Sequence, residues 1–516
     1  MWSFGHSVIW SFFIRRAALA AASLGLMMAA GACVEEKIPP DRLVVLVESY
    51  PANLDPRIGT DQASARFFHL AFEGLTRVGP KGEILPLLAE RWEVDESGTT
   101  YTFHLRRDAA FHHGKTFSSE DIAFTYEQFL KEDFISAKKE PYEAIEAVEA
   151  LDAHTVRFRL RKPFASFLNA AALGVVPSDG AHTAERPVGT GPFALAEAVR
   201  DSHLLLRAHA AHPAPPSVRE IELRVVPDAT AREMALQKGS AHLAVNNILP
   251  TALERLESDP SLRVVRAPGG NFTYLGFNLE DPQLSRPEVR RAIAHAVDRE
   301  RMIEGLLEGL GREADSVLPP HLWAHADDVP RHPYDPERAK ALLDEAGFRP
   351  GADGVRFRLL YKTSTESLAR RKAVLLQEFL RAVGIALDIR SYEFATFYED
   401  IRRGNFQLYS LTWVGMNDPD LLHYIFHGSS VPPRGANRGR YRNARVDELL
   451  DAARSALDNR IRKTYYEEVQ KIVAAELPYV PLWYSTNVAV ASHRVEGLEL
   501  WPAGEFTPLA GVRLRP

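Results

Sequence analysis

The sequence predicts a protein of α/β or α+β class that is built from two or more domains. The chain has 516 residues, and single hydrophobic cores rarely grow beyond about 250–300 residues. Segments with strand periodicity alternate with segments with helix periodicity along the chain, which is typical of these classes. No long low-complexity stretch separates independent domains. We therefore expect lobes built from interleaved segments, with the chain crossing between them more than once.

Several segments have the residue pattern of β-strands. The run LVVLV at 43–47 is continuously apolar, as expected of a strand that is buried on both faces. Within 98–107, the apolar Tyr101, Phe103 and Leu105 alternate with polar residues, which is typical of a half-buried strand. Further strands are predicted at 154–162, 218–226 and 479–490, and a turn is predicted at 51–56.

The helical segments are recognised by their end signals. Ser285 is positioned to cap the most strongly periodic helix, predicted over 286–309. Asp335 as N-cap and Gly347 as terminator delimit the next helix. Helices are also predicted within 118–130, in 375–384 before a strand that reaches 393, and over 443–457 and 460–476.

Composition excludes few classes of protein, but it does restrict the chemistry. The formal net charge is −6, which argues against a non-specific nucleic-acid binder because such a protein needs a basic face. The sequence contains one cysteine, Cys33. No internal disulfide, thiolate metal site or cysteine redox pair can therefore be built.

The N-terminal segment has the pattern of a secretion signal. Arg15 and Arg16 precede the small, apolar run AALAAASLGLMMAAGAC at 17–33, which is too short to span a bilayer comfortably. It resembles a bacterial lipoprotein signal, and this resemblance implies lipidation of Cys33. The pattern departs from that family at Ala30, where leucine is usual. Cleavage without a lipid and an uncleaved anchor are the alternatives, and the charged, proline-containing residues 34–41 would form a tether.

Six stretches occur in a characteristic order: the segment 54–126, PVGTGPFAL (187–195), the segment 273–303, YDPERAKALLDEAGF (334–348), GNFQLYSLTWVGMNDPD (404–420) and LPYVPLWY (477–484). In this order and spacing they resemble the extracytoplasmic solute-binding proteins of ABC importers. The family in question includes dipeptide-, oligopeptide- and nickel-binding proteins.

The resemblance implies the two-lobed periplasmic-binding-protein, or flytrap, fold. In this fold two crossover strands join the lobes, and a further subdomain is inserted in the first lobe. Mapped onto this chain, lobe I comprises 42–60, 185–268 and 490–516, the insert comprises 61–184, and lobe II comprises 269–489. The crossovers are expected near 267–274 and 482–486, where Gly269 and Gly270 suit a change of backbone angles.

The resemblance also implies a function. The protein would be the substrate-binding component of an ABC uptake transporter that captures a peptide or a similar small solute between its lobes. It would deliver this solute to a membrane permease and its ATPase subunits, acting outside the cytoplasmic membrane as a monomer. No cofactor, metal, nucleic acid or catalysis is implied.

The loop SLTWVGMNDPD at 410–420 differs from the family pattern at the residue that would select a peptide amine. In peptide-binding relatives, an aspartate three residues after the tryptophan pairs with the α-ammonium of the peptide. Here Trp413 is present, but Met416 stands at that place and Asp418 is the nearest carboxylate. Either Asp418 does the same work, or the pocket takes a solute without that ammonium. Turn capping is the alternative reading of Asp418 and Asp420.

Other candidate ligand contacts come from the stretches that border the cleft in this family. Arg438 or Arg440, in GANRGRYRN at 435–443, can meet a ligand carboxylate, although a solvated turn is the favoured interpretation of each arginine. The remaining candidates are Asn437 and Tyr441 in the same stretch, Tyr50 after the first strand, Asn271 and Tyr274 on one crossover, and Trp483 and Tyr484 on the other.

Three other functions have some support in the sequence. A metal site at His112 and His113 is disfavoured, because adjacent residues of a strand point apart. An enzyme is disfavoured because the sequence lacks G-x-S-x-G, G-x-x-x-x-G-K-[ST] and G-x-G-x-x-G patterns. A ligand-binding partner of a periplasmic sensor or chemoreceptor remains open, because the sequence does not separate it from a transport protein.

Overall fold

The computed structural model describes residues 38–515. The predicted signal segment 1–33 with Cys33, and residues 34–37 of the predicted tether, lie outside the described residues. Across the part of the chain that is described, no helix combines the length and the apolar character needed to cross a bilayer.

The main sheet contains 11 strands within residues 38–515. Its order is β15–β14–β16–β12–β17–β11–β1–β10–β9–β8, and the short β13 pairs with β17 outside this path. At its centre, β12 (Leu262–Phe277) and β17 (Tyr479–Ser492) pair in antiparallel register. The other strands are β1 (Arg42–Val47), β8 (Phe193–Val199), β9 (His203–Ala208), β10 (Glu220–Val225), β11 (Leu243–Val245), β13 (Gly311–Glu313), β14 (Phe357–Ser364), β15 (Ile385–Tyr392) and β16 (Leu408–Trp413).

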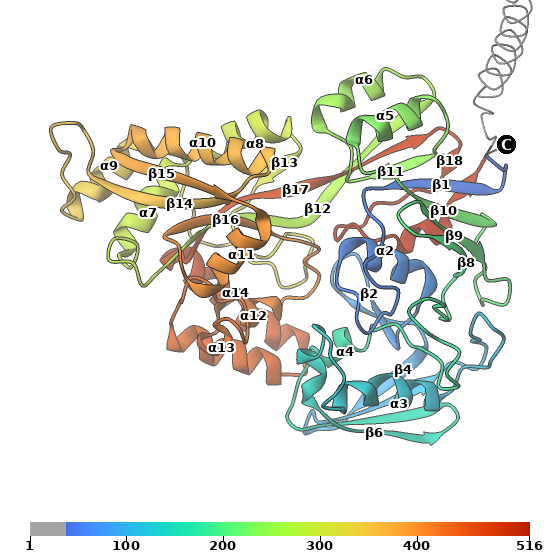
Figure 1. Ribbon diagram of the computed structural model, residues 1–516. Helices are drawn as coiled ribbons and strands as arrows, with labels where there is room; N and C mark the ends of the chain where they lie inside the picture. Colours follow the sequence, from blue (N-terminus) through green and yellow to red (C-terminus); the bar gives the residue numbers. More distant parts are fainter. Residues whose placement is uncertain (1–37, 516) are drawn as a thin grey trace, which may run out of the picture. The chain divides into compact units, whose positions relative to one another are not determined.

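Separate apolar cores at the two ends of this sheet confirm the predicted two-lobed α/β fold. Leu43, Phe67 and Leu223 belong to the core at the β1 end, whereas Leu359 and Leu380 belong to a core at the β14 end. β12 and β17 pass from one end to the other (Figure 1), and the predicted crossover segments lie within them. The exact lobe boundaries stay a prediction.

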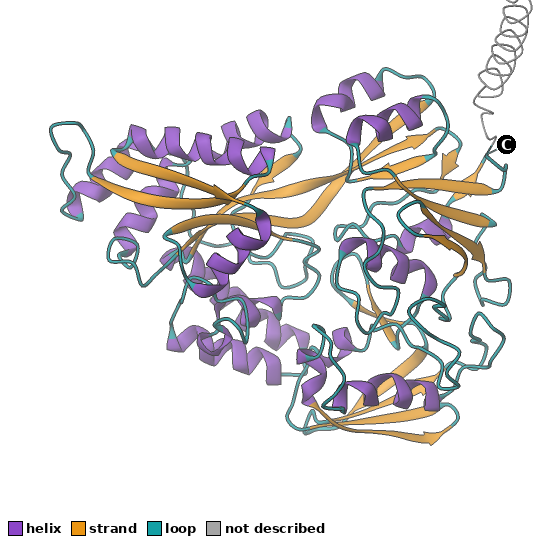
Figure 2. Ribbon diagram, in the orientation of Figure 1, coloured by secondary structure: helices purple, strands orange, loops and turns teal. Residues whose placement is uncertain are grey.

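Helices cover the sheet in both lobes (Figure 2). Those that pack on the lobe that contains β1 are α2 (Gln62–Ala71), α5 (Ala229–Gln237) and α6 (Leu253–Glu257). α2 belongs to the segment predicted as the insert, but its apolar residues lie in the core of this lobe. Those of the lobe that contains β14 are α7 (Pro287–Ala296), α8 (Arg299–Leu307), α9 (Pro336–Glu345), α10 (Ser367–Ala382), α11 (Phe394–Arg403), α12 (Leu421–Phe426), α13 (Ala444–Ser455) and α14 (Asn459–Glu476).

The predicted insert contains an antiparallel sheet of its own, in the order β4–β5–β7–β6. Phe103, Phe158 and Phe167 are fully buried in its core, and their rings meet edge to face or at an angle. Its elements are β4 (Ala89–Val94), β5 (Thr100–Leu105), α3 (Ser119–Glu127), β6 (Ile145–Asp152), β7 (Thr155–Leu160) and α4 (Phe167–Ala170), next to the hairpin of β2 (Thr76–Val78) and β3 (Ile84–Pro86).

The prediction of one continuous helix over 286–309 is wrong. The chain leaves the helical conformation at 297–298, and a new helix, α8, begins there. Asp298 accepts a hydrogen bond from the Arg301 backbone N–H at 2.9 Å, so its side chain starts α8 as an N-cap. The N-cap of α7 is Arg286 rather than the predicted Ser285. Hydrophobic periodicity continues through the break because both helices pack on the same core.

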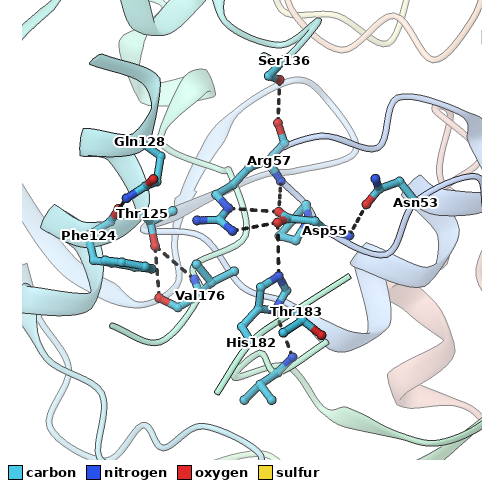
Figure 3. A network of polar contacts seen from close by, with 12 residues as sticks. Asn53, Asp55, Arg57, Phe124, Thr125, Gln128, Ser136, Val176, His182 and Thr183 are labelled. Carbon is cyan, nitrogen blue, oxygen red and sulfur yellow. Dashed lines mark hydrogen bonds and ion pairs between the residues drawn. The ribbon is translucent and has the colours of Figure 1, made fainter. Parts of the chain in front are cut away.

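A buried ionic network fastens the loop after β1 to the insert (Figure 3). Arg57 donates Nε at 3.0 Å and Nη2 at 2.7 Å to the Asp55 carboxylate, and His182 Nε2 lies 3.4 Å from Asp55 Oδ2. Ser136 Oγ donates to the Arg57 carbonyl at 2.6 Å. Burial alone would raise the pKa of Asp55, but hydrogen bonds from His182 and Arg57 hold this pKa well below its usual range.

We expect Asp55→Asn to lower the free energy of unfolding by about 3 kcal/mol at pH 7, because it leaves a buried arginine without its counter-ion. A depressed carboxyl pKa stabilises the fold above the unfolded-state pKa, and this contribution is lost as the pH falls through the folded-state pKa. The difference between wild type and variant should therefore shrink below about pH 4. Urea unfolding at a series of pH values measures it.

Asp108→Asn is the matched control. Asp108 also pairs with an arginine, Arg106, but its side chain is 63% exposed, so its loss should cost less than about 1 kcal/mol. Equal effects of the two substitutions, or a cost of Asp55→Asn that does not change with pH, would contradict this account of the network.

Candidate functional site

The candidate site is built around the loop 414–420, which follows strand β16. β16 pairs antiparallel with β12, and Trp413 lies opposite Phe272. Asn271, also on β12, accepts a hydrogen bond from the Gly415 N–H at 2.8 Å. Gly415 has a φ of +63°, which glycine adopts at little cost. Asn271, predicted as a ligand contact, thus holds the loop in this structure.

The loop lies where lobe II meets the other parts of the fold. Gly82 of the insert packs closely on the loop, since a Cβ atom added to it would lie 2.9 Å from the Asn417 carbonyl oxygen. Gly415 of the loop packs against Ala503, whose carbonyl oxygen would lie 3.5 Å from a Cβ atom added to Gly415. Nearby, the backbone N–H of Trp323 donates a hydrogen bond at 3.2 Å to the backbone carbonyl of Lys81, which belongs to the insert. The site is therefore bordered by lobe I, the insert and lobe II.

Arg438 provides a buried cation beside the loop. Its guanidinium lies 4.9 Å from the ring centroid of Trp413 and 5.4 Å from that of Tyr398. It donates to the hydroxyl of Tyr274 at 3.2 Å and to that of Tyr398 at 3.0 Å. These contacts are cation–π interactions and neutral hydrogen bonds. Among residues 38–515, no carboxylate forms an ion pair with Arg438.

Aromatic side chains around Arg438 reach the surface of lobe II. Phe394 is stacked on Tyr398 with 5.9 Å between ring centroids, and Tyr424 meets Trp413 edge to face at 6.4 Å. Phe394 and Tyr424 are both exposed. Such rings offer large, rigid contact area with a polar edge. This face therefore suits a ligand that carries both apolar and anionic groups.

Asp418 lines a cavity of about 420 Å³ between the insert and lobe II. Burial, and secondly the charge of Asp420, raise the pKa of Asp418 to about 6, although Arg462 acts in the opposite direction. Asp418 forms no ion pair with any residue of 38–515. Side chains that line the same cavity are Trp92, Tyr101, Ser166, Asn169, Trp323 and Arg462.

Asp420 has a different environment from its neighbour. Arg454 donates Nε and Nη2 to its carboxylate at 2.8–3.0 Å, and both side chains are largely buried. The Asp420 N–H also donates to Asp418 Oδ1 at 3.0 Å, so Asp418 closes the turn that sequence chemistry indicated. Asp420 is thus neutralised within the protein, whereas Asp418 both closes a turn and faces the cavity.

Most of the other predicted ligand contacts are buried in this structure. Tyr484 donates its hydroxyl to the Ser316 carbonyl at 2.5 Å, and Asn437 Nδ2 donates to the Tyr441 carbonyl at 2.8 Å. Tyr50 packs against the core of lobe I. Their ligand-binding roles stay predictions. Residues of this group with no more than 3% exposure are Met416, Tyr274, Asn437, Tyr441, Trp483 and Tyr484.

Several residues of the site were not predicted. Arg462 donates to Ser166 Oγ of the insert at 2.9 Å and lies 5.4 Å from the ring centroid of Trp323. Tyr398 completes the setting of Arg438. These side chains come from α11, α14, the insert and an irregular segment, so no local motif joins them. Only a model of the whole fold brings them together.

Comparisons with known proteins agree with one another. A family described as bacterial extracellular solute-binding proteins, family 5 Middle, matches residues 83–431. A dipeptide-binding protein of Escherichia coli is 28% identical, covering 93% of this chain and 96% of the relative. Heme-binding protein A of Haemophilus influenzae is 30% identical, covering 82% of this chain and 83% of the relative.

Solved structures show the same similarity along almost the whole chain. The oligopeptide-binding protein AppA of Bacillus subtilis, in complex with a nonapeptide, has a TM-score of 0.77 and 26% identity, covering 92% of this chain and 99% of that one. HbpA2 of Haemophilus parasuis has a TM-score of 0.82 and 25% identity, covering 92% of this chain and 100% of that one.

We expect Asp418→Asn to raise the free energy of unfolding at pH 8 by up to about 3 kcal/mol, with little change at pH 4. A carboxyl whose folded-state pKa is raised stabilises the fold below its unfolded-state pKa, and this contribution is lost as the pH rises through the folded-state value of about 6. The neutral amide avoids that loss. Urea unfolding at the two pH values measures the difference.

Asp420→Asn serves as the matched comparison and should act in the opposite direction. It removes the partner of Arg454, so it should lower stability at pH 8 by about 3 kcal/mol. Destabilisation of similar size in both variants would show that Asp418 is satisfied by the protein and is not a free carboxylate.

Proposed function

We propose that this chain, which belongs to the bacterial extracellular solute-binding proteins of family 5, captures a peptide or a similar small cationic solute through Asp418. The solute is held between the lobes and handed unchanged to the permease of an ABC importer. The relatives described above are binding proteins, and the proposal assigns no bond-making or bond-breaking step to any residue.

The unpaired carboxylate of Asp418 carries the proposal. Its raised pKa means that ionising it in the cavity costs free energy. Arg462 lowers this pKa from within the same cavity but forms no ion pair with Asp418. A peptide α-ammonium would supply the direct counter-ion, so that the cost is offset when this ligand is bound. The alternative, in which Met416 forms an apolar floor for a neutral solute, is less well supported, because only 1% of Met416 is exposed.

Arg438 supports a ligand with charges of both signs. It is a cation without a carboxylate partner among residues 38–515, and guanidinium groups bind carboxylates in two parallel hydrogen bonds. The rings of Trp413 and Tyr398 both contact its guanidinium group and help to hold it in place. A short peptide offers an ammonium, a carboxylate and apolar side chains, and thus matches Asp418, Arg438 and the aromatic face.

Two of the relatives described above fit this ligand class, and one does not. The Escherichia coli relative is named for dipeptides and the Bacillus subtilis structure holds a nonapeptide, but the Haemophilus influenzae relative is named for heme. Family membership alone therefore leaves the solute open. The argument for a peptide comes from the charges of this chain's own residues.

Capture by lobe closure follows from differential binding. A solute that contacts both lobes only in the closed state shifts the population toward that state. Closure also removes water from the site, which strengthens each charge pair and hydrogen bond there. The strands β12 and β17 run through both lobes, so the motion would have to be taken up within or beside them.

We expect dipeptides with a free amine to bind less tightly as the pH falls below about 6, by about tenfold per pH unit, because the binding form of Asp418 is ionised. The peptide amine stays protonated over this range, so the change reports on the protein. Isothermal titration calorimetry between pH 4.5 and 7.5 measures it. In Asp418→Asn the affinity should be lower at pH 7 and should no longer depend on pH.

The N-acetylated form of the same dipeptide is the ligand control. It lacks the ammonium and should bind weakly at every pH. Equal affinity for the free and the acetylated peptide would refute the assignment of Asp418 while leaving capture of another solute by the same cleft intact.

We further infer that Cys33 carries a lipid that tethers the protein outside the cytoplasmic membrane. Changing Cys33 to Ser should abolish lipid attachment, leaving the chain either released from membranes or unprocessed. Fractionation of cells followed by mass spectrometry of the N-terminus distinguishes these outcomes from the wild type. A serine variant that remains processed at the same position and bound to membranes would contradict the lipoprotein signal.

A further inference from the structure

The chain near its C-terminal end is tied to β17 and to α2. The side chain of Asn487, on β17, donates Nδ2 to the Pro502 carbonyl at 3.0 Å. The backbone N–H of Phe506 donates to Nδ1 of His69, on α2, at 3.3 Å. These two hydrogen bonds hold the backbone on both sides of Glu505, so this carboxyl group is presented from a fixed position.

Glu505 lines a second cavity, of about 470 Å³, which reaches the candidate loop. Phe68 and Phe72 of α2 line this cavity as well, and lobe II contributes Asn417 to it. The next residue of the loop, Asp418, lines the cavity described above. The Cα atoms of consecutive residues lie only about 3.8 Å apart. The two cavities therefore adjoin at this loop.

The carboxylate of Glu505 has no partner within the protein. Among residues 38–515 it takes part in no ion pair and no hydrogen bond, and burial raises its pKa to about 7. An ionised carboxylate in such a place costs free energy unless a cation accompanies it. The second cavity therefore offers a place for a cationic group of a ligand.

Most of the other ionisable groups in this cavity are neutral or are paired within the protein. Arg106 donates to the Asp108 carboxylate at 2.6 and 3.0 Å. His212 Nε2 lies 3.1 Å from Glu73 Oε1. Burial lowers the pKa of His69 to about 4, so this imidazole carries no charge at pH 7. These groups leave the charge of Glu505 uncompensated.

The remaining lining of the cavity is apolar around Glu505 and basic only at its outer edge. Arg77 is exposed and also lines a neighbouring surface groove. Burial, and not the charge of Arg77, shifts the pKa of Glu505. Phe68, Phe72 and Leu87 supply apolar walls. Apolar walls with one unpaired carboxylate suit an aliphatic chain that ends in an ammonium group.

We propose that Glu505 binds a second cationic group of the solute, which selects short peptides with a basic aliphatic side chain such as lysine. The α-ammonium would pair with Asp418 in one cavity, and the side-chain ammonium would pair with Glu505 in the other. This inference rests on the proposed function and deepens it. Glu505 precedes Phe506, which is buried in the core of lobe I, whereas Asp418 belongs to lobe II. Such a solute is therefore paired with a carboxylate of each lobe.

Isothermal titration calorimetry with the dipeptides Ala-Lys and Ala-norleucine at pH 8 tests the proposal. Norleucine keeps the aliphatic chain of lysine but lacks its ammonium. We expect the wild type to bind Ala-Lys at least about tenfold more tightly, as a charge-assisted hydrogen bond requires. In Glu505→Gln the affinity for Ala-Lys should fall to that for Ala-norleucine, whose own affinity should not change. Asp418→Asn should weaken both peptides and keep the preference for lysine.

The ratio of the two affinities isolates Glu505 from Asp418, because both peptides carry the same α-ammonium. In the wild type the preference for lysine should be lost as the pH falls through about 7, since the binding form of Glu505 is ionised. Titrations between pH 5 and 8 measure it. In Glu505→Gln the ratio should stay constant, which separates Glu505 from His212 and Glu73 of the same cavity.

Glu499→Gln is the matched control, because Glu499 is exposed and does not line this cavity. It should keep the preference of the wild type. Thermal unfolding verifies that each variant is folded, and the pH dependence of the wild-type ratio carries the test if Glu505→Gln does not fold. Equal affinity of the wild type for the two peptides, or an unchanged preference in Glu505→Gln, would overturn this inference and leave the role of Asp418 intact. Absence of binding of both peptides would overturn the proposed function together with this inference.

Discussion

The paired strands β12 and β17 are the constraint on which the remaining structure depends. They run through both lobes, and β16 is bonded to β12 over six residue pairs, so the loop 414–420 starts at a fixed place in the sheet. The ladder is interrupted between Pro268 and Phe272. There the two strands pack so closely that a Cβ atom added to Gly269 would lie only 2.5 Å from the Ser485 carbonyl oxygen. An interrupted ladder bends more readily than a continuous one, so we expect any relative motion of the lobes to be taken up in this region.

Two carboxylates at the end of this loop have opposite roles, although only one residue separates them. Asp420 is neutralised by Arg454, and this pair supports the start of α12. Asp418 has no such partner within residues 38–515, and burial raises its pKa. A protein under selection for stability alone would neutralise both. The free energy that an ionised Asp418 costs is what one expects at a binding site, where a ligand offsets it.

The sequence predicted the fold well because the fold rests on repeated local signals. The alternation of Tyr101, Phe103 and Leu105, and the cap at Asp335, are visible in the chain and are found in the structure. The break at Asp298 was missed because the apolar period runs through it. For the candidate site, Trp413 matched the family pattern, whereas Asp418 was considered only as the carboxylate nearest to Met416, which occupies the place of the usual aspartate. The cavity around Asp418 could not be predicted, because Arg462 and Ser166 are distant in sequence and meet only after the insert packs on lobe II.

Tertiary contacts at both ends hold the loop 414–420 in place. A helix of six residues has little stability of its own, since helix formation needs several turns to repay its nucleation cost. The place of α12 is therefore fixed by tertiary contacts: the Asp420–Arg454 pair at its start, and the contact of His423 with Asp451 of α13 along its side. Asn271 fixes the other end of the loop. A loop held at both ends loses little entropy when a ligand binds, so under the proposed function the contacts that stabilise α12 would also influence the affinity of Asp418 for a cation.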